Sequence, residues 1–268
     1  MRIEPTQSST LRAQRKAQNK LKKSFERLSS GKKLNRAADN PAALAIYKQL
    51  EAQEVSLGQA SRNTGMGMDM ARTMDGAMSQ QSTILNRMRE LSVQAGNGTI
   101  NADQRGMIAQ EFNNLRSDLD RIASTTSLNG QPLLQGGTME LQVGPNSGAD
   151  SQVTLSIPDS TSGNLGLGAT NVSTSGDAWS AIDSIDKAIQ SLNTQRANIG
   201  STENRLEHTQ SNLHQTIENH SAARSRIGDT DFAEESTNLS RQRFMLQAAL
   251  RVQQIEAQQK GNVLNLIA

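Results

Sequence analysis

The last third of the sequence carries an apolar line with a seven-residue period. Its members are Ile185, Leu192, Ile199, Leu206, Leu213, His220 and Ile227. A second line, offset by three residues, becomes partly polar and comprises Ile182, Ile189, Arg196, Glu203, Gln210, Ile217 and Arg224. Two lines at this spacing are typical of a helix that packs against partner helices through a heptad seam. We expect one helix over about residues 177–226, roughly 75 Å long at about 1.5 Å per residue.

Two earlier stretches show the same alternation of three- and four-residue steps. They cover residues 67–95 and 108–122, and both predict amphipathic helices with coiled-coil-like seams. Residues 96–99 supply glycines for a turn, and Asn101 with Gln104 predicts a capping box for the second helix. The residues expected to form the core seam are Met88, Leu91, Phe112, Leu115, Leu206 and Leu213. The last two should be buried against both helices.

Both ends of the chain are also amphipathic. Their apolar positions include Leu21, Phe25, Leu28, Leu239, Leu246, Leu250, Leu264 and Leu266. The final helix adds apolar residues on other faces, so a single partner helix cannot cover it. Such a helix requires neighbours on several sides, as it would have inside a polymer.

Residues 129–176 differ in kind from the rest of the sequence. They hold nine of the twenty glycines, three of the five prolines and no Lys or Arg. Residues 139–143 and 153–157 alternate apolar and polar positions with a period of two, which predicts a β-hairpin. The Ser-, Thr- and Gly-rich residues 159–176 predict an exposed loop.

Composition limits the kinds of function that are open to the chain. It contains no Cys, which excludes disulfides and thiolate metal sites. No apolar run reaches the ~18–20 residues of a membrane span, and the first residues lack the pattern of a cleavable secretory signal. Residues 1–36 hold eleven Lys and Arg but only two acidic residues. This charge indicates either contact with an acidic surface or a solvated helix face; without an aromatic platform we expect no nucleic-acid partner.

The candidate chemical groups do not form a site. His208, His214 and His220 are six residues apart, so on one helix they point in three directions and cannot share a metal ion. His220 falls on the seam, where a polar residue can set the register of a coiled coil. Glu234 and Glu235 lack a neighbouring base or nucleophile and suit the start of a helix. We expect no enzyme activity, no metal and no cofactor.

Several segments resemble bacterial flagellin. Residues 25–46 (FERLSSGKKLNRAADNPAALAI), 85–99, 119–134 and 141–148 are similar to its amino-terminal half, and residues 204–213, 225–241 and 262–267 to its carboxy-terminal half. The resemblance covers most of the chain in order. It implies a mainly α fold of long antiparallel helices forming a coiled-coil rod. It also implies that the apolar residues named above for the two ends of the chain pair as a terminal coiled coil and support polymerisation. Residues 1–40 and 230–268 would line the lumen of a filament, and residues 41–229 would form a helical core domain with a β-hairpin and loops at 129–176. The outer variable domains of the family look absent.

The same resemblance implies a function and partners. The chain is expected to be a structural subunit that polymerises with itself into the bacterial flagellar filament, outside the cell, for swimming motility. It implies the flagellar export apparatus, an export chaperone and the filament cap as partners, with export that needs no cleaved amino-terminal signal. A host innate-immune receptor reads flagellin, and the residues that match its contacts are Arg87, Leu91 and Glu111. Arg87 lies off the seam and is expected to be free for such a contact, whereas Leu91 lies on the seam and can equally be a core residue.

Two alternatives remain open. The hook–filament junction protein shares the terminal helices of the family, although RLEHTQSNL and AEESTNLSR favour the filament subunit. An intracellular coiled-coil adaptor that binds anionic surfaces would also explain the basic first helix.

Overall fold

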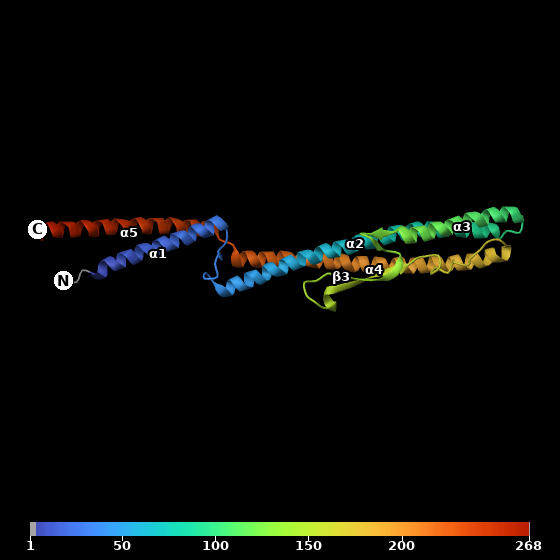
Figure 1. Cartoon of the computed structure of the whole chain (residues 1–268), viewed down its shortest axis with the longest axis horizontal. Helices are drawn as coiled ribbons and strands as arrows, with labels where there is room; N and C mark the ends of the chain where they lie inside the picture. Colours follow the sequence, from blue (N-terminus) through green and yellow to red (C-terminus); the bar gives the residue numbers. More distant parts are fainter. Residues whose placement is uncertain (1–3, 268) are drawn as a thin grey trace. The chain divides into compact units, whose positions relative to one another are not determined.

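The computed structural model describes residues 4–267, and the side chains of residues 11–255 and 257–259. The described chain is mainly helical, with a small β region. Its helices are α1 (Glu4–Ser30), α2 (Pro41–Ala95), α3 (Ala102–Thr125), α4 (Ser175–Gly228) and α5 (Phe232–Ile267) (Figure 1). The predicted fold class, long helices with one small hairpin region, is confirmed.

The chain forms two compact units. The terminal unit comprises residues 1–54 and 218–268, and the core unit comprises residues 55–217. Helices α2 and α4 each contribute to both units. The domain boundaries expected from the sequence, after residue 40 and before residue 230, lie next to helix ends and stay a prediction.

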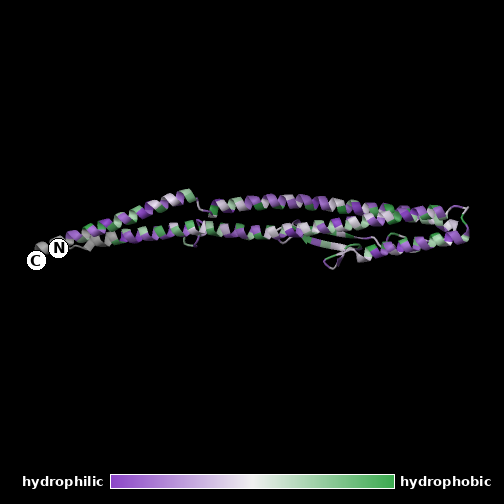
Figure 2. Cartoon of the chain, turned by 90° about the horizontal axis from the view of Figure 1, so that it is seen from above, coloured by the Kyte–Doolittle hydropathy of each residue, from purple (hydrophilic) through white to green (hydrophobic). Residues whose placement is uncertain are grey.

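The helices of the core unit run antiparallel. Arg89 of α2 bonds to Asp186 of α4, and Arg72, earlier in α2, bonds to Glu203, later in α4. Helix α3 also runs antiparallel to α2. Gln81 of α2 donates to the carbonyl of Leu119, which lies near the end of α3. Apolar and polar residues are interleaved along every helix (Figure 2), as expected for helices that each bury one face.

The polar part of the second heptad line has a structural role. Arg196 forms an ion pair with Asp75 at 2.8 Å, and Gln210 donates to the hydroxyl of Ser61 at 2.8 Å. Both partners belong to α2. The polar positions of α4 are therefore matched one by one along its partner helix, which fixes the register of the antiparallel pair.

The ends of the helices follow the sequence signals. Asn101 accepts from the backbone of Gln104 at 2.8 Å, and the Gln104 side chain accepts from the backbone of Asn101 at 3.3 Å. These reciprocal bonds confirm the predicted capping box. The helix expected over 177–226 is also confirmed, since α4 spans Ser175–Gly228.

The predicted β-hairpin is present. Strands β3 (Gln135–Gln142) and β4 (Gln152–Asp159) pair antiparallel, with Met139 opposite Leu155 and Leu141 opposite Val153. A short 3₁₀ turn, η1 (Ala149–Ser151), precedes β4. One face of the hairpin is buried, through Leu141, Val143, Val153, Leu155 and Ile157. The amide of Asn63 ties the hairpin to α2 by donating to the carbonyl of Gln142 at 2.9 Å.

The segment after the hairpin is a packed strap (residues 159–172) and not the exposed loop that was expected. Leu167 and Val172 are fully buried within it. Asp120 of α3 accepts from the backbone and hydroxyl of Ser162, both at 2.7 Å, and Arg116 donates to the carbonyl of Thr170. The prediction was wrong because a Ser- and Gly-rich composition conceals a few well-placed apolar side chains.

The core seam lies where the sequence placed it, with one correction. Met88, Leu91, Phe112 and Leu206 are buried in one cluster, and the half-buried Leu115 packs against that cluster. Leu213 is buried too, but it packs with Leu57, Ala60 and Ile217. Its expected contact with residues 67–95 and with the next helix was therefore wrong, because α2 begins at Pro41 and provides a partner before residue 67.

Candidate functional site

The two terminal helices pack side by side through a heptad seam that is only partly apolar (Figure 1). On α1 one line of covered positions, Ala17, Leu21, Ser24 and Leu28, follows steps of four, three and four. On α5 the corresponding line is Glu235, Leu239, Gln242, Leu246, Ala249 and Gln253, with the same alternation. The four predicted leucines Leu21, Leu28, Leu239 and Leu246 therefore belong to this seam, and each remains half-buried.

The other predicted terminal residues lie elsewhere. Phe25 is exposed, and the guanidinium of Arg243 lies 5.2 Å from the centre of its ring. Leu250 is exposed on α5, outside the seam. Leu264 and Leu266 lie beyond the described side chains. The sequence reasoning missed the small and polar seam members, such as Ser24 and Glu235, because it followed apolar residues alone; the three–four spacing itself would have found them.

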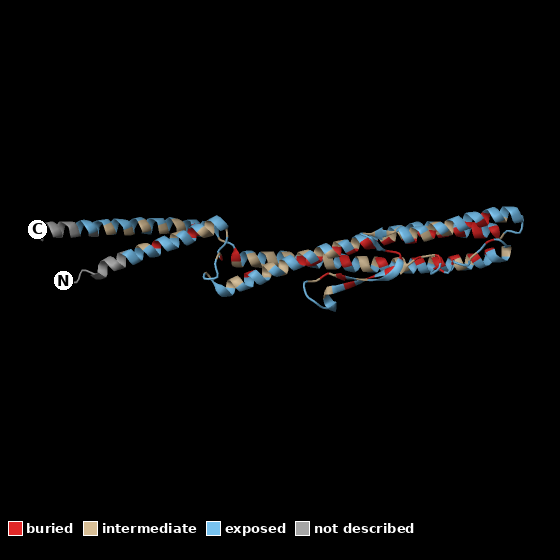
Figure 3. Cartoon of the chain, in the orientation of Figure 1, coloured by how far each residue is buried: buried red, intermediate tan, exposed pale blue. Residues whose placement is uncertain are grey.

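The outward surface of α5 is apolar over several turns. Phe244 is 71% exposed and Ile255 54% exposed, and Met245 and Val252 are exposed on neighbouring positions. Leu250 is exposed too, about 120° around the helix from Phe244. Large apolar side chains gathered on one exposed surface indicate an interaction site. Figure 3 shows the contrast within the chain: along the described parts of α1 and α5 most residues are exposed or half-buried, whereas α2 and α4 carry runs of buried residues.

A shallow groove follows the seam between α1 and α5. Half of the residues that line it are alanines, and the full lining comprises Ala13, Lys16, Ala17, Lys20, Gln242, Met245, Ala248 and Ala249. The hollow measures about 380 Å³. Alanines on both helices leave room for an apolar side chain of another molecule, and the stems of the two lysines add apolar lining.

The face of α1 that turns away from the seam is basic. A second hollow there is lined by Arg12, Arg15, Lys16, Asn19, Lys20 and Lys23. Residues at these spacings form one stripe along a helix. Among the described side chains, only Lys23 of this stripe is held in an ion pair. Among the described side chains, most of the positive charge of this stripe is therefore displayed to solvent.

Backbone hydrogen bonds join the two segments that connect these helices to α2 and α4. Lys32 and Asp229 form an isolated antiparallel bridge, in which the backbone of Lys33 donates to the carbonyl of Gly228 at 2.6 Å. The backbone of Thr230 donates to the carbonyl of Gly31 at 2.9 Å. We call this bridged region the joint (residues 31–40 and 228–231). Two connections far apart in sequence are thereby fixed to each other.

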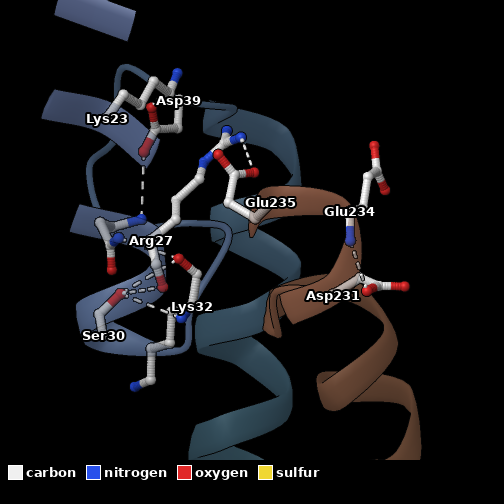
Figure 4. A network of polar contacts seen from close by, with 9 residues as sticks. Lys23, Arg27, Ser30, Lys32, Asp39, Asp231, Glu234 and Glu235 are labelled. Atoms are coloured by element: carbon white, nitrogen blue, oxygen red, sulfur yellow. Dashed lines mark hydrogen bonds and ion pairs between the residues drawn. The ribbon is translucent and has the colours of Figure 1, made fainter. Parts of the chain in front are cut away.

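A network of side chains surrounds the joint (Figure 4). The ammonium of Lys23 lies 2.6 Å from Asp39, whose other oxygen accepts from the backbone of Asn35 and Arg36. The Lys23 hydrogen bond, followed by these backbone bonds, holds the pKa of Asp39 below its usual value even though partial burial opposes the shift. Arg27 reaches Glu235 of α5 at 3.5 Å. The network connects α1, the joint and α5 within the terminal unit.

Tyr47 packs against the joint. The ring is buried, and the ammonium groups of Lys32 and Lys48 lie 5.7 and 6.0 Å from its centre. Gly228 rests directly against this ring, so that a methyl group added at Gly228 would overlap it. The last residue of α4 is therefore glycine because its backbone lies too close to the Tyr47 ring for a side chain.

The residues matched to an immune-receptor contact separate into two groups. Arg87 and Glu111 are exposed and joined by an ion pair at 2.8 Å, so the structure brings these two together across α2 and α3. Arg87 also contacts Glu90 at 3.0 Å, hence it is not free as expected. Leu91 is 1% exposed and belongs to the core. Its expected role as a surface contact is corrected, because only a rearrangement of the helices would expose it.

Two kinds of feature are absent from the described residues. None of the described helices is long and apolar enough to cross a membrane. Within the same part of the chain, no group of three or more His, Cys, Asp or Glu side chains is arranged to hold a metal ion.

Comparisons with known families match both helical regions. A family described as the bacterial flagellin N-terminal helical region matches residues 5–138. A family described as the bacterial flagellin C-terminal helical region matches residues 182–267. The interval between the two matches contains half of β3, all of β4 and the strap, so the family features lie mainly in the long helices.

Individual relatives agree over nearly the whole chain. It is 39% identical over 251 residues to a flagellin of Halalkalibacterium halodurans, a match that covers 93% of this chain and 92% of that protein. It is 34% identical over 281 residues to a flagellin of Bacillus subtilis, with 91% and 92% covered. Among solved structures, the crystal structure of Bacillus cereus flagellin matches with a TM-score of 0.51 and 36% identity, over 57% of this chain and 88% of that one.

Proposed function

The chain belongs to the bacterial flagellin family, and on that premise we propose that it polymerises through the outward surfaces of α1 and α5. Its function is that of a structural subunit of the bacterial flagellar filament. We further propose that residues 1–40 and 230–268 line the lumen of the filament, with residues 41–229 outside them.

The exposed apolar surface of α5 is the observation that carries this proposal. Helix α1 covers one side of α5 only, and Phe244, Met245 and Ile255 remain in water in the free subunit. Fully burying one such side chain is worth about 1.5–3 kcal/mol. Burial of several such side chains by neighbouring subunits would offset much of the entropy lost on assembly.

Truncation tests the proposal. Removal of residues 240–268 deletes most of α5 and leaves every residue of the core unit in place. The truncated chain should remain a soluble, helical monomer that does not elongate filament seeds, as measured by sedimentation and electron microscopy. A point variant, Phe244→Ser, should raise the concentration needed for growth by roughly tenfold. Normal filaments from the truncated chain would refute the proposal.

The alternatives are disfavoured by what the chain matches. The relatives described above are flagellins, and a further relative, 34% identical over 244 residues, is a flagellar filament 31.3 kDa core protein of Treponema maltophilum. A hook–filament junction protein would occupy a single ring at one end of a filament, whereas this subunit should label the filament along its length. An intracellular adaptor would bind anionic surfaces as a monomer with steep salt dependence.

Export and extracellular location follow as proposals. We propose that the flagellar export apparatus delivers the chain outside the cell, with an export chaperone and the filament cap as further partners. No amino-terminal signal would be removed on this route. Mass spectrometry of the assembled filament should therefore place its amino terminus at Met1 or Arg2, and a start many residues later would contradict export without cleavage.

A host innate-immune receptor for flagellin is a second proposed partner. The support is the exposed pair Arg87–Glu111, which presents a guanidinium and a carboxylate from neighbouring helices at one place. Both kinds of group make strong charge-assisted hydrogen bonds with a partner. The free subunit would bind this receptor, and packing in the filament would cover the same surface.

A further inference from the structure

The single tryptophan of the chain lies exposed near the start of α4. Trp179 is 64% exposed, and Val93 of α2, one helical turn before Gly96, is also exposed. Large aromatic side chains are expensive to leave in water and are enriched at the centres of protein interfaces. An exposed tryptophan on a rigid helix therefore indicates a docking surface.

The indole is held in a defined position. A methyl group built at Gly96 would lie 3.0 Å from the indole nitrogen of Trp179, so the ring rests against the backbone at the end of α2. The neighbouring Ala178 and Ala181 are fully buried and anchor this turn of α4 in the core. A side chain that is already fixed loses little conformational entropy when a partner covers it.

Acidic residues surround the tryptophan. The stretch from Ser175 to Asp186 contains three aspartates and no Lys or Arg. Asp183 and Asp186 follow Trp179 by four and seven residues, so the three share one helical face. Asp186 is neutralised by Arg89 at 2.7 Å, whereas Asp183 makes no ion pair with the described side chains. An aromatic ring beside an unpaired carboxylate suits a partner that presents Lys or Arg.

The chain itself offers a surface of the required charge. The terminal unit holds 18 Lys and Arg against 11 Asp and Glu, a net charge of +7, and the core unit holds 10 against 15, a net charge of −5. When complementary patches lie on different parts of one chain, copies associate through a heterologous contact. A heterologous contact that does not close into a ring repeats indefinitely and builds a helical polymer.

We infer that Trp179 is an intersubunit contact: its exposed indole, with Asp183 beside it, docks on the basic terminal unit of a second copy. The inference rests on the proposed function as a polymerising subunit and names one contact within that polymer. It is separate from the apolar surface of α5, because Trp179 belongs to the core unit.

The tryptophan reports on its own burial. Since the chain has no second tryptophan, fluorescence of the wild-type protein reads Trp179 alone, in the free subunit and in filaments grown from seeds. The emission of the filament should shift to shorter wavelength than that of the free subunit. Quenching by acrylamide should fall severalfold. Filament formation is followed independently by sedimentation and electron microscopy.

Variants test whether the contact contributes to growth. Trp179→Ser should raise the concentration needed for elongation by roughly tenfold or more, the usual effect of losing an aromatic anchor. Trp179→Phe should retain most of the growth because it keeps a ring, and Asp183→Asn should slow growth most at low salt. Both side chains, Trp179 and Asp183, are exposed in the free subunit, so none of the three variants should change its thermal unfolding.

The outcomes separate this inference from the proposed function. Filaments in which Trp179 is as accessible to acrylamide as in the free subunit would overturn the inference alone, as would normal growth of Trp179→Ser. Failure of the wild-type chain to form filaments would overturn the proposed function and this contact with it.

Discussion

The core unit and the terminal unit use the same heptad spacing but fill it differently. In the core, Phe112, Leu192 and Leu206 are completely buried. In the terminal seam, Leu239 and Leu246 are half-buried, and they alternate with Glu235 and Gln242. Seven-residue periodicity therefore predicts which helices pair, whereas the residues at the seam determine how far the pair is stable without further partners.

This difference assigns separate tasks to the two units. The core unit buries most of its large apolar residues within one chain, through three helices, the hairpin and the strap, and Trp179 is an exception. The terminal pair leaves Phe244 and Ile255 exposed and requires neighbouring subunits to cover them. A subunit built in this way can keep its core folded before assembly and obtain the rest of its buried surface from the polymer.

The largest expected effect is a loss of stability in the core unit that leaves the terminal helix pair unchanged. Leu206→Ala removes a completely buried side chain and should lower the free energy of unfolding of the core by about 2–5 kcal/mol. The matched variant Leu246→Ala acts at a half-buried position and should cost the free subunit much less. Amide hydrogen exchange along α4 and α5 measures the two effects separately. Equal losses from both variants would remove the distinction between the units.

The second prediction concerns the joint, where the terminal unit is tightly packed. Gly228→Ala places a methyl group on the buried ring of Tyr47 and should destabilise the joint by about 1–3 kcal/mol. The control is Gly200→Ala on the same helix, where the added methyl group meets nothing within 4 Å and should stabilise α4 by up to ~1 kcal/mol. Thermal unfolding followed by circular dichroism compares them, and two similar melting temperatures would argue against the close contact.

Much of this fold was predictable because periodic patterns and caps act locally. The seam of α4, the capping box at Asn101 and the hairpin register around Leu141 and Leu155 all follow from short-range rules. The small hairpin of β1 (Ser127–Leu128) and β2 (Gln131–Pro132) was missed, although Asn129–Gly130, with φ of 52° and 79°, is its usual signal.

Long-range packing was the part that the sequence did not reveal. Whether Leu167 and Val172 of the strap are buried depends on α3 passing beneath them, and no local pattern encodes that. The availability of Arg87 was misjudged for the same reason, because its partner Glu111 is brought close by the turn between α2 and α3. Residue spacing gives faces of helices, but contacts between elements require their arrangement in space.

A third prediction uses pH to probe the joint. Hydrogen bonding lowers the pKa of Asp39 in the folded state, so its ionised form stabilises the joint at any pH above the unfolded value of about 3.9. That contribution is lost as the pH falls through the lower folded pKa. Protection factors for amide exchange at residues 31–40, which correct for the slower intrinsic exchange at low pH, should therefore fall more on acidification in the wild-type chain than in Asp39→Asn. The same acid response in both would exclude Asp39 as its source.

The smallest expected effect on stability belongs to the exposed pair proposed as a receptor contact. Arg87 and Arg89 lie on the same helix with side chains 50% and 46% exposed, and each bonds to an acidic residue of another helix. Exposed pairs of this kind contribute little to folding, so neither Arg87→Ala nor Arg89→Ala should shift the melting of the free subunit. Surface plasmon resonance with the host receptor should nevertheless separate them: Arg87→Ala weakens binding and Arg89→Ala leaves it unchanged. Because the two variants remove the same charge from the same helix, a general electrostatic attraction would weaken both equally. Unchanged affinity of the Arg87→Ala subunit would return Arg87 to the role of a solvated surface residue.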